Sequence, residues 1–342
     1  MPFQVIVTRD FDHMSEVAAG LVAEDIRQVV ARKSSYALGL ATGSSPTGLY
    51  KHLAKAANAG AFDASAVASF NLDEYVGLPG ENAQQRALHK ESYSCFMIQE
   101  LFGLLQKKFR ETNVPWGTLI DQDRFAAEME AHSSDWSLQG ADKGKAVKIS
   151  TDAKSEYLRW IQKEILAAYA AKIEKQGGID LHIVGVGGRG HVGFHEAGIP
   201  FENNPMLLVK LDDNTIANAI TDGHFATRKE SPLYAVSMGA SLIYRARTVL
   251  LLANGTRKTD AVTDALLMEP DCSVPISYGH TLSENGGRMI FVLDREAAAR
   301  ILDHADKLRK RGIELEDISS QKASVRVADL KFSRNPETGL MG

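Results

Sequence analysis

The sequence is poor in cysteine, with only two among 342 residues. Cysteines are the residues that would stabilise a small domain through disulfides or metal binding. Cys95 and Cys272 lie far apart, and neither belongs to a CxxC pair or to a metal-ligand spacing. We therefore expect reduced thiols in a cytoplasmic protein, with no disulfide framework and no metal site.

Long apolar runs and an excess of one charge are also missing. No uninterrupted apolar segment approaches the length of a membrane-spanning helix, and the first residues, MPFQV, lack a basic region followed by an apolar one. We therefore expect neither a membrane span nor a signal peptide. The formal net charge is −4, which implies no general attraction to nucleic acid or to anionic membranes. An anionic ligand would need a local binding site.

The composition is that of an ordinary globular protein, with 44% hydrophobic and 24% charged residues. β-Rich apolar runs alternate with amphipathic stretches, which predicts a single doubly wound, Rossmann-like α/β domain. Its sheet would be mostly parallel, with helices on both faces. We place the domain at residues 1–310, with a surface insertion at about 120–150. Residues 311–342 form a C-terminal extension that packs on the domain or trails from it.

The predicted elements follow from periodicity and from turn residues. Strands are expected at 3–8, 36–41, 66–72, 179–186, 206–211, 233–237, 248–253 and 288–294. Helices are expected at 14–30, 49–57, 86–105, 155–175, 214–220, 238–244, 259–268 and 296–309. The polar insertion is interpreted as a solvated loop with a short helix at 125–131.

A glycine-rich segment follows the apolar run at 179–186, and residues 184–196 are VGVGGRGHVGFHE. Glycine lets another backbone or a ligand approach closely. His191, His195 and Glu196 are placed beyond the carboxyl end of the strand, where open α/β sheets bind their ligands. The segment is therefore a candidate catalytic loop. The alternative is an ordinary glycine-rich turn with no chemical role.

Two further turns join a strand to a helix. Thr42, Gly43, Ser44 and Ser45 lie in the first turn, and backbone N–H groups and hydroxyls at a helix start favour a phosphate. The alternative is a helix cap made of Ser and Thr. The second turn, residues 254–258, ends in Lys258, a cation that would suit a helix start only if it serves an anion.

Two adjacent acids, Asp73 and Glu74, follow the strand at 66–72. Neighbouring side chains on an extended chain point in opposite directions, so one would face the ligand crevice and the other solvent or a partner. A carboxylate in a half-closed pocket can act as a general base. The alternative is a pair of loop acids that cap the next helix.

Five segments in this order resemble the glucosamine-6-phosphate deaminases (isomerases), whose superfamily also contains 6-phosphogluconolactonases. The most specific is FNLDEYVGL at residues 70–78, followed by the glycine, histidine, phenylalanine and glutamate spacing of residues 190–196. The other three segments are residues 40–46, 91–93 and 255–258. Because the lactonases usually lack the phenylalanine and glutamate after the histidine, the deaminase branch fits better.

The resemblance implies roles for individual residues. Asp73 would move a proton between C2 and C1 of an open-chain amino-sugar phosphate. His191 would open the sugar ring, and Glu196 would orient it. Thr42, Gly43, Ser44, Ser45 and Lys258 would hold the substrate phosphate, and Glu74, Gly187, Gly188, Arg189, Gly190 and His195 are further pocket candidates. No cofactor is implied, and a homo-oligomer is expected because such assemblies are common in the family.

Some positions depart from the family pattern. Arg189 stands where the family has an acidic partner of the histidine, His195 replaces an asparagine, and Ile220 aligns with a phosphate-binding arginine. We therefore keep three hypotheses. The first is an amino-sugar-phosphate deaminase acting on the glucosamine or galactosamine compound. The second is another sugar-phosphate isomerase or a lactone hydrolase. The third is a non-catalytic sugar-phosphate sensor.

Overall fold

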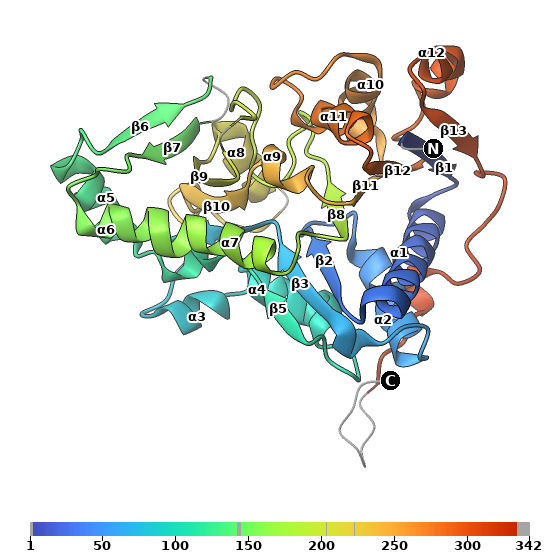
Figure 1. The fold of residues 1–342 in the computed structure, drawn as a ribbon, viewed down its shortest axis with the longest axis horizontal. Helices are drawn as coiled ribbons and strands as arrows, with labels where there is room; N and C mark the ends of the chain where they lie inside the picture. Colours follow the sequence, from blue (N-terminus) through green and yellow to red (C-terminus); the bar gives the residue numbers. More distant parts are fainter. Residues whose placement is uncertain (1–2, 142–144, 203, 222, 334–342) are drawn as a thin grey trace.

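The computed structural model describes residues 3–141, 145–202, 204–221 and 223–333, which form two β-sheets flanked by helices (Figure 1). Within these residues the larger sheet has eight strands in the order β13-β1-β12-β11-β8-β2-β3-β5, and all its neighbouring pairs are parallel. The predicted doubly wound, mostly parallel sheet is confirmed. In chain order its strands are β1 (Phe3–Thr8), β2 (Tyr36–Leu40), β3 (Val67–Asn71), β5 (Glu111–Asn113), β8 (Leu181–Gly185), β11 (Thr248–Ala253), β12 (Arg288–Asp294) and β13 (Glu314–Asp317).

Strand β12 illustrates why helices cover both faces of this sheet. Ile290 and Val292 pack into one apolar cluster, whereas Phe291 and Leu293 pack into another on the opposite face. Each large apolar side chain that is fully buried stabilises the fold by roughly 1.5–3 kcal/mol. A strand that is apolar on both faces therefore needs a helical layer on each side.

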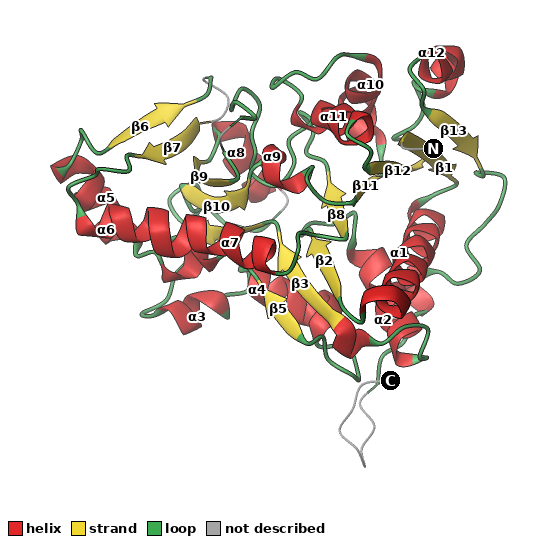
Figure 2. Cartoon of the chain, in the orientation of Figure 1, coloured by secondary structure: helices red, strands yellow, loops and turns green. Residues whose placement is uncertain are grey.

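The helices divide accordingly between the two faces (Figure 2). On the first face are α1 (Phe11–Lys33), α2 (Thr47–Asn58) and α4 (Tyr93–Met97), which continues as a π-helical turn over Ile98–Phe102. On the second are α6 (Glu156–Trp160), a π-helical stretch (Ile161–Ala167), α7 (Ala168–Lys175), α10 (Thr259–Leu267), α11 (Gly279–Glu284) and α12 (Ala305–Lys310). The Asp10 carboxylate caps α1 by accepting a hydrogen bond from the backbone N–H of His13.

The smaller sheet is antiparallel, with five described strands in the order β4-β10-β9-β7-β6. These are β4 (Asp73–Val76), β6 (Trp136–Gln139), β7 (Lys145–Ile149), β9 (Met206–Lys210) and β10 (Tyr234–Met238). Leu72 joins the two sheets, because its N–H donates to Leu40 in the larger sheet and its C=O accepts from Met238 in the smaller one. The junction fixes the position of the next residue, Asp73.

The structure corrects the interpretation of residues 120–150 as a solvated loop. They contain α5 (Gln122–Ala131), which includes the predicted short helix, and the strands β6 and β7. Phe125, Val147 and Ile149 are buried in the core. Short strands with one wet face carry too few apolar residues to stand out in a polar sequence. The strands predicted at 206–211 and 233–237 are present, as β9 and β10, but both belong to this second sheet.

Two predicted helices were too long. The helix expected at 86–105 is divided into α3 (Ala83–Ala87) and α4, because residues 88–92 form a turn that ends at the cap residue Ser92. The helix expected at 296–309 begins as turns and becomes a regular α-helix only in α12. The remaining short helices are α8 (Asp213–Thr221) and α9 (Ala240–Ile243), both close to their predicted positions.

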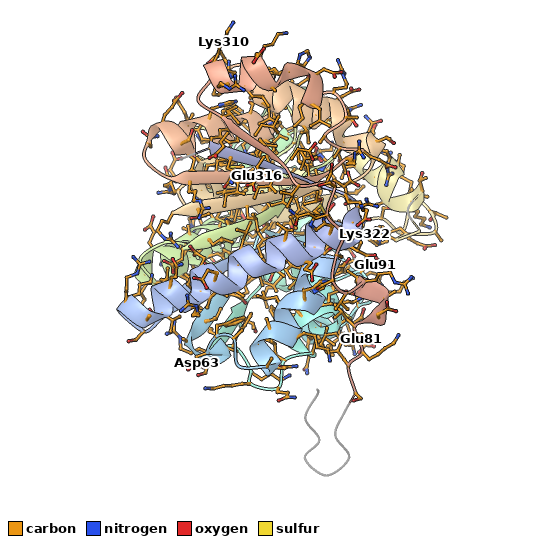
Figure 3. All side chains as sticks on the ribbon, turned by 90° about the vertical axis from the view of Figure 1, so that its right-hand side faces the viewer. Asp63, Glu81, Glu91, Lys310, Glu316 and Lys322 are labelled. Carbon is orange, nitrogen blue, oxygen red and sulfur yellow. The ribbon has the colours of Figure 1, made fainter. Side chains whose placement is uncertain are left out.

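After β13, residues 318–333 run back across α1 and α2 (Figure 1). The backbone N–H groups of Ser324 and Val327 donate to the carboxylates of Glu16 and Asp12 on α1. This part of the C-terminal extension therefore packs on the domain. Among the labelled charged side chains of Figure 3, Lys310 and Asp63 lie at opposite ends of the ribbon. None of the helices in the described ranges is both long and apolar enough to cross a membrane.

Candidate active site

Three turns meet beyond the carboxyl ends of β2, β8 and β11. The Ser45 hydroxyl in the first donates a hydrogen bond of 2.7 Å to the Asn254 side chain in the third. A Cβ atom on Gly188, in the second, would lie 3.9 Å from the backbone oxygen of Arg257 in the third. The structure therefore brings the predicted phosphate-binding turns and the glycine-rich loop together, as expected where parallel strands end at one edge.

The two predicted phosphate turns present both backbone and side chains. Gly43 and Ser44 are exposed, Thr42 and Lys258 are half-buried, and Ser45 is buried. Gly255 adopts a φ of +83°, which favours glycine, and its N–H donates to the Asp294 carboxylate at the end of β12. This carboxylate fixes the turn that carries Lys258. The N-terminus of α2 adds the positive end of a helix dipole next to Ser44 and Ser45.

The glycine-rich loop holds the His191 ring directly over its own backbone. The Gly187 N–H donates to the His191 C=O, and a Cβ atom on Gly187 would lie 1.9 Å from His191 Nε2. Only glycine fits at this position. His191 Nδ1 lies 3.3 Å from Glu196 Oε2, so the loop pairs an accessible imidazole with a buried carboxylate.

Glu196 is held as a carboxylate by its neighbours. Burial alone would raise the pKa of Glu196, but the His191 ring, the Thr215 hydroxyl and the Arg189 charge outweigh this and lower it. The Thr215 hydroxyl donates to Glu196 Oε1 over 2.5 Å. Glu196 Oε2 is thus placed to accept a hydrogen bond from Nδ1 of His191 and to orient the ring.

Arg189 pairs with an acidic residue other than Glu196. Its guanidinium Nη1 lies 3.1 Å from Asp212 Oδ2, just before α8, and its side chain is 43% exposed. The glycine-rich loop therefore carries a solvent-accessible cation next to the candidate acid–base pair.

His195 has a structural role. Its Nδ1 accepts a hydrogen bond from the Ala240 N–H, which leaves Nε2 to donate to the Ile199 C=O. Burial lowers the pKa of His195 to about 4, so the ring is neutral near pH 7. This pocket candidate ties the loop to α9 and has both ring nitrogens engaged by backbone.

The two adjacent acids, Asp73 and Glu74, have different surroundings in the structure. Glu74 accepts hydrogen bonds from the Ser92 hydroxyl and from the N–H groups of Tyr93 and Ser94, so it caps α4. Asp73 is also buried, but its Oδ1 has no hydrogen-bond partner among the described residues. Burial raises the pKa of Asp73 well above its usual range, and the Glu74 charge adds to this effect. Of the two, Asp73 is the carboxylate available for chemistry.

Asp73 faces the glycine-rich loop. A Cβ atom on Gly193 would lie 3.2 Å from Asp73 Oδ2 and 2.9 Å from the Ser237 hydroxyl, and the φ of Gly193 is +54°. The Ser237 hydroxyl accepts a hydrogen bond from the Phe194 N–H, which anchors the loop to β10. Any side chain at residue 193 would separate Asp73 from the segment that carries His191 and Glu196.

Sequence reasoning missed four residues that hold this arrangement: Asn254, Thr215, Asp212 and Ser237. Asn254 was within a turn that we had singled out, whereas the other three carry no local signal.

Two surface hollows lie apart from these turns. That of about 230 Å³ includes Arg32, Lys33 and Asp180 at the amino edge of the large sheet, and that of about 430 Å³ includes Arg124, Tyr157 and Trp160. In the first hollow an ion pair between Lys33 and Asp180 already joins α1 to the sheet.

A parallel α/β sheet with acid–base groups grouped at its carboxyl edge is the architecture of an α/β enzyme. Comparisons with known proteins define the family. The profile described as glucosamine-6-phosphate isomerases/6-phosphogluconolactonase matches residues 120–285. The glucosamine-6-phosphate deaminase of Clostridium botulinum (strain Loch Maree / Type A3) is 31% identical over 298 residues, which cover 87% of this chain and 98% of the relative. That of Thermoanaerobacter sp. (strain X514) is 30% identical over 303 residues, covering 88% and 96%.

Solved structures agree on the fold. A monomeric glucosamine-6-phosphate deaminase matches with a TM-score of 0.64 at 23% identity, covering 86% of this chain and 99% of its own. The 6-phosphogluconolactonase of Trypanosoma brucei matches with a TM-score of 0.54 at 16% identity, covering 87% and 98%. The chain therefore belongs to the family of glucosamine-6-phosphate isomerases and 6-phosphogluconolactonases.

Proposed function

We propose that the protein is an amino-sugar-phosphate deaminase, which converts glucosamine-6-phosphate and water into fructose-6-phosphate and ammonia, or acts likewise on the galactosamine compound. The observation that carries this proposal is the position of Asp73. Its carboxylate is buried against the loop of His191 and Glu196, and its Oδ1 has no hydrogen-bond partner among the described residues. Curated relatives that align over almost their whole length are named as glucosamine-6-phosphate deaminases, which supports the same reaction.

In this mechanism His191 transfers protons to and from the ring oxygen and O1, so that the sugar opens to its aldehyde. Asp73 then removes the proton from C2 while O1 takes up a proton, and it returns the proton to C1 as the amino group loses one, which leaves C1 as an alcohol and C2 as an imine. Water hydrolyses the imine to a ketone and ammonia. Burial makes Asp73 a stronger base than a solvated carboxylate, as abstraction from carbon requires.

The phosphate is assigned to the turns of residues 42–45 and 254–258. The helix dipole of α2, the Ser44 hydroxyl and the Lys258 ammonium would bind a dianion, while the Ser45 hydroxyl, which donates to Asn254, would hold the two turns together. Holding the phosphate in this way fixes C1 and C2 over the base, so that binding energy contributes to orientation.

A second candidate is lactone hydrolysis on the same scaffold, which the accessible Arg189 guanidinium favours. Opening a sugar lactone produces a carboxylate, and a cation beside His191 would bind that product.

The protein is also proposed to form a homo-oligomer. Sedimentation velocity on the full chain would measure it.

The test measures ammonia release coupled to ketose-phosphate formation, with glucosamine-6-phosphate and galactosamine-6-phosphate in parallel and Asp73→Asn as control. Turnover of either sugar that is lost in Asp73→Asn supports the deaminase. If neither sugar turns over, the deaminase assignment is wrong. Hydrolysis of 6-phosphogluconolactone would then support the second candidate, and thermal stabilisation by sugar phosphates without turnover would support a sensor.

A further inference from the structure

The two oxygens of Glu196 face different elements. Oε2 lies 3.3 Å from His191 Nδ1, while Oε1 accepts a hydrogen bond of 2.5 Å from the Thr215 hydroxyl in the first turn of α8. Glu196 is buried, so it cannot exchange the Thr215 hydroxyl freely for water. The orientation of the carboxylate toward His191 therefore depends on a residue that is 19 positions away in the sequence.

The same turn of α8 makes a second contact with the glycine-rich loop. Asp212 immediately precedes α8, and its backbone C=O accepts the N–H of Ile216 in the first turn. Its carboxylate, only 8% exposed, pairs with Arg189 over 3.1 Å. The start of α8 thus contacts the loop on both sides of His191. It contacts Arg189, which precedes His191, and Glu196, which follows it.

We propose that the first turn of α8 is the positioning element of the His191–Glu196 pair. Thr215 sets the rotamer and the charge of Glu196, and the Asp212–Arg189 pair docks the turn onto the loop. This inference rests on the proposed function only for the role of His191. It explains why an arginine is tolerated beside the histidine: its charge is directed to Asp212, and Glu196 alone orients the ring.

The charged surroundings of Glu196 fit this assignment. His191 and Arg189 in the loop lower its pKa, Thr215 does so from α8, and His195 lies behind it as a neutral ring. Asp212 also faces Arg189 and compensates part of its charge. Replacing the Thr215 hydroxyl by a methyl removes a donor to the charged form, so the pKa of Glu196 must rise.

The activity test uses Thr215→Val, which preserves shape, with Thr215→Ser as the rescue. Thr221→Val is the matched control, since the Thr221 hydroxyl donates to the Ala217 carbonyl of the same helix. With glucosamine-6-phosphate we expect kcat of Thr215→Val to fall roughly ten-fold, because a hydrogen bond to a charged group is lost. KM should be unchanged, and the acidic limb of the kcat profile should move to higher pH. Thr215→Ser and Thr221→Val should behave as wild type.

A fall in stability without a moved pH limb, or failure of Thr215→Ser to restore kcat, would overturn the proposal. A second measurement does not depend on the substrate. The carboxyl ¹³C resonance of Glu196, assigned with Glu196→Gln in glutamate-labelled protein, should titrate at higher pH in Thr215→Val than in Thr221→Val. If wild type releases no ammonia but this shift occurs, the proposed function fails and the positioning role stands. An unshifted titration refutes the positioning role whatever the substrate is.

Discussion

The two sheets contribute different parts of the site. The parallel sheet supplies turns at strand ends, which is where backbone N–H groups and helix dipoles are available to an anion. The antiparallel sheet supplies the proposed base, because Asp73 begins β4, and it anchors the candidate catalytic loop through Ser237 on β10. The proposed base and the proposed phosphate turns thus stand on separate sheets that meet at Leu72, while His191 and Glu196 follow β8 of the parallel sheet. Substitutions should therefore separate the two.

The largest effect is expected from Asp73→Asn on the antiparallel side. The kcat for ammonia release should fall by roughly 10²–10⁴-fold, the usual contribution of general acid–base catalysis. Folding stability should not fall, because the change removes an unpaired buried carboxylate. Glu74→Gln is the comparison, and it should lose about 2 kcal/mol of unfolding free energy, since it disturbs the cap of α4. Urea unfolding and steady-state kinetics on both variants measure this. Equal loss of kcat in both would contradict the division of roles.

On the parallel side, Lys258→Met should raise KM for the phosphorylated sugar by roughly ten- to a hundred-fold while kcat changes little. The cation is expected to bind a group that does not react. Lys107→Met is the control, because Lys107 is an exposed lysine that pairs with Asp63. Steady-state kinetics and competition by inorganic phosphate report the effect. A fall in kcat at unchanged KM would instead place Lys258 in the chemistry.

One buried histidine lies on β8 and another in the glycine-rich loop, and both should make the fold sensitive to acid. Burial lowers the pKa of His182 on β8 to about 3 and that of His195 to about 4. The unfolded chain takes up these protons near pH 6.5, so stability is present above that pH and is lost as pH falls toward the folded values. Between pH 7 and pH 5 each ring should cost about 2 kcal/mol.

Urea unfolding at several pH values tests this in His182→Leu and His195→Asn, each of which should lose less stability than wild type over that interval. Asp73 and Glu74 have raised pKa values and act in the opposite direction, but they are common to all three proteins. Parallel stability curves for wild type and His182→Leu would show that this ring does not titrate on unfolding.

The smallest effect concerns the hydrogen bond that joins the two phosphate turns. Ser45→Ala removes the contact with Asn254, at a cost of about 1 kcal/mol in phosphate binding, or a few-fold in KM. Ser35→Ala, at a half-buried position between α1 and β2, is the control. Isothermal titration with a non-reactive sugar phosphate would measure the difference. Unchanged affinity would mean that the two turns keep their geometry independently.

The parts of the site that could be predicted are those whose signal is local. Gly43 to Ser45 and the loop at 187–196 stand directly after buried strands, so their sequence shows both the turn and its position at the sheet edge. The resemblance to a family assigned the role of base to Asp73 and not to Glu74, and this stays a prediction. The residues alone could not do so, because the difference lies in Ser92, which turns Glu74 into a cap.

The second sheet and the role of α8 were not predictable from the same signals. Strands β6 and β7 are short and partly exposed. Strand β6 pairs with β7 and β7 pairs with β9, which no periodicity indicates. Thr215 is an ordinary polar residue of a short helix, and only the tertiary fold brings it to Glu196. Contacts between elements that are remote in sequence depend on strand order, which a single sequence leaves undetermined.

The position of β1 has a consequence for synthesis. It lies between β12 and β13, so Val5 is paired with Phe291 on one side and with Leu315 on the other. During translation this apolar strand has neither of its two partner strands until almost all of the described chain has left the ribosome. Until then its unpaired edges can pair with other chains. Truncated translation products should therefore be the form of this protein that depends most on chaperones.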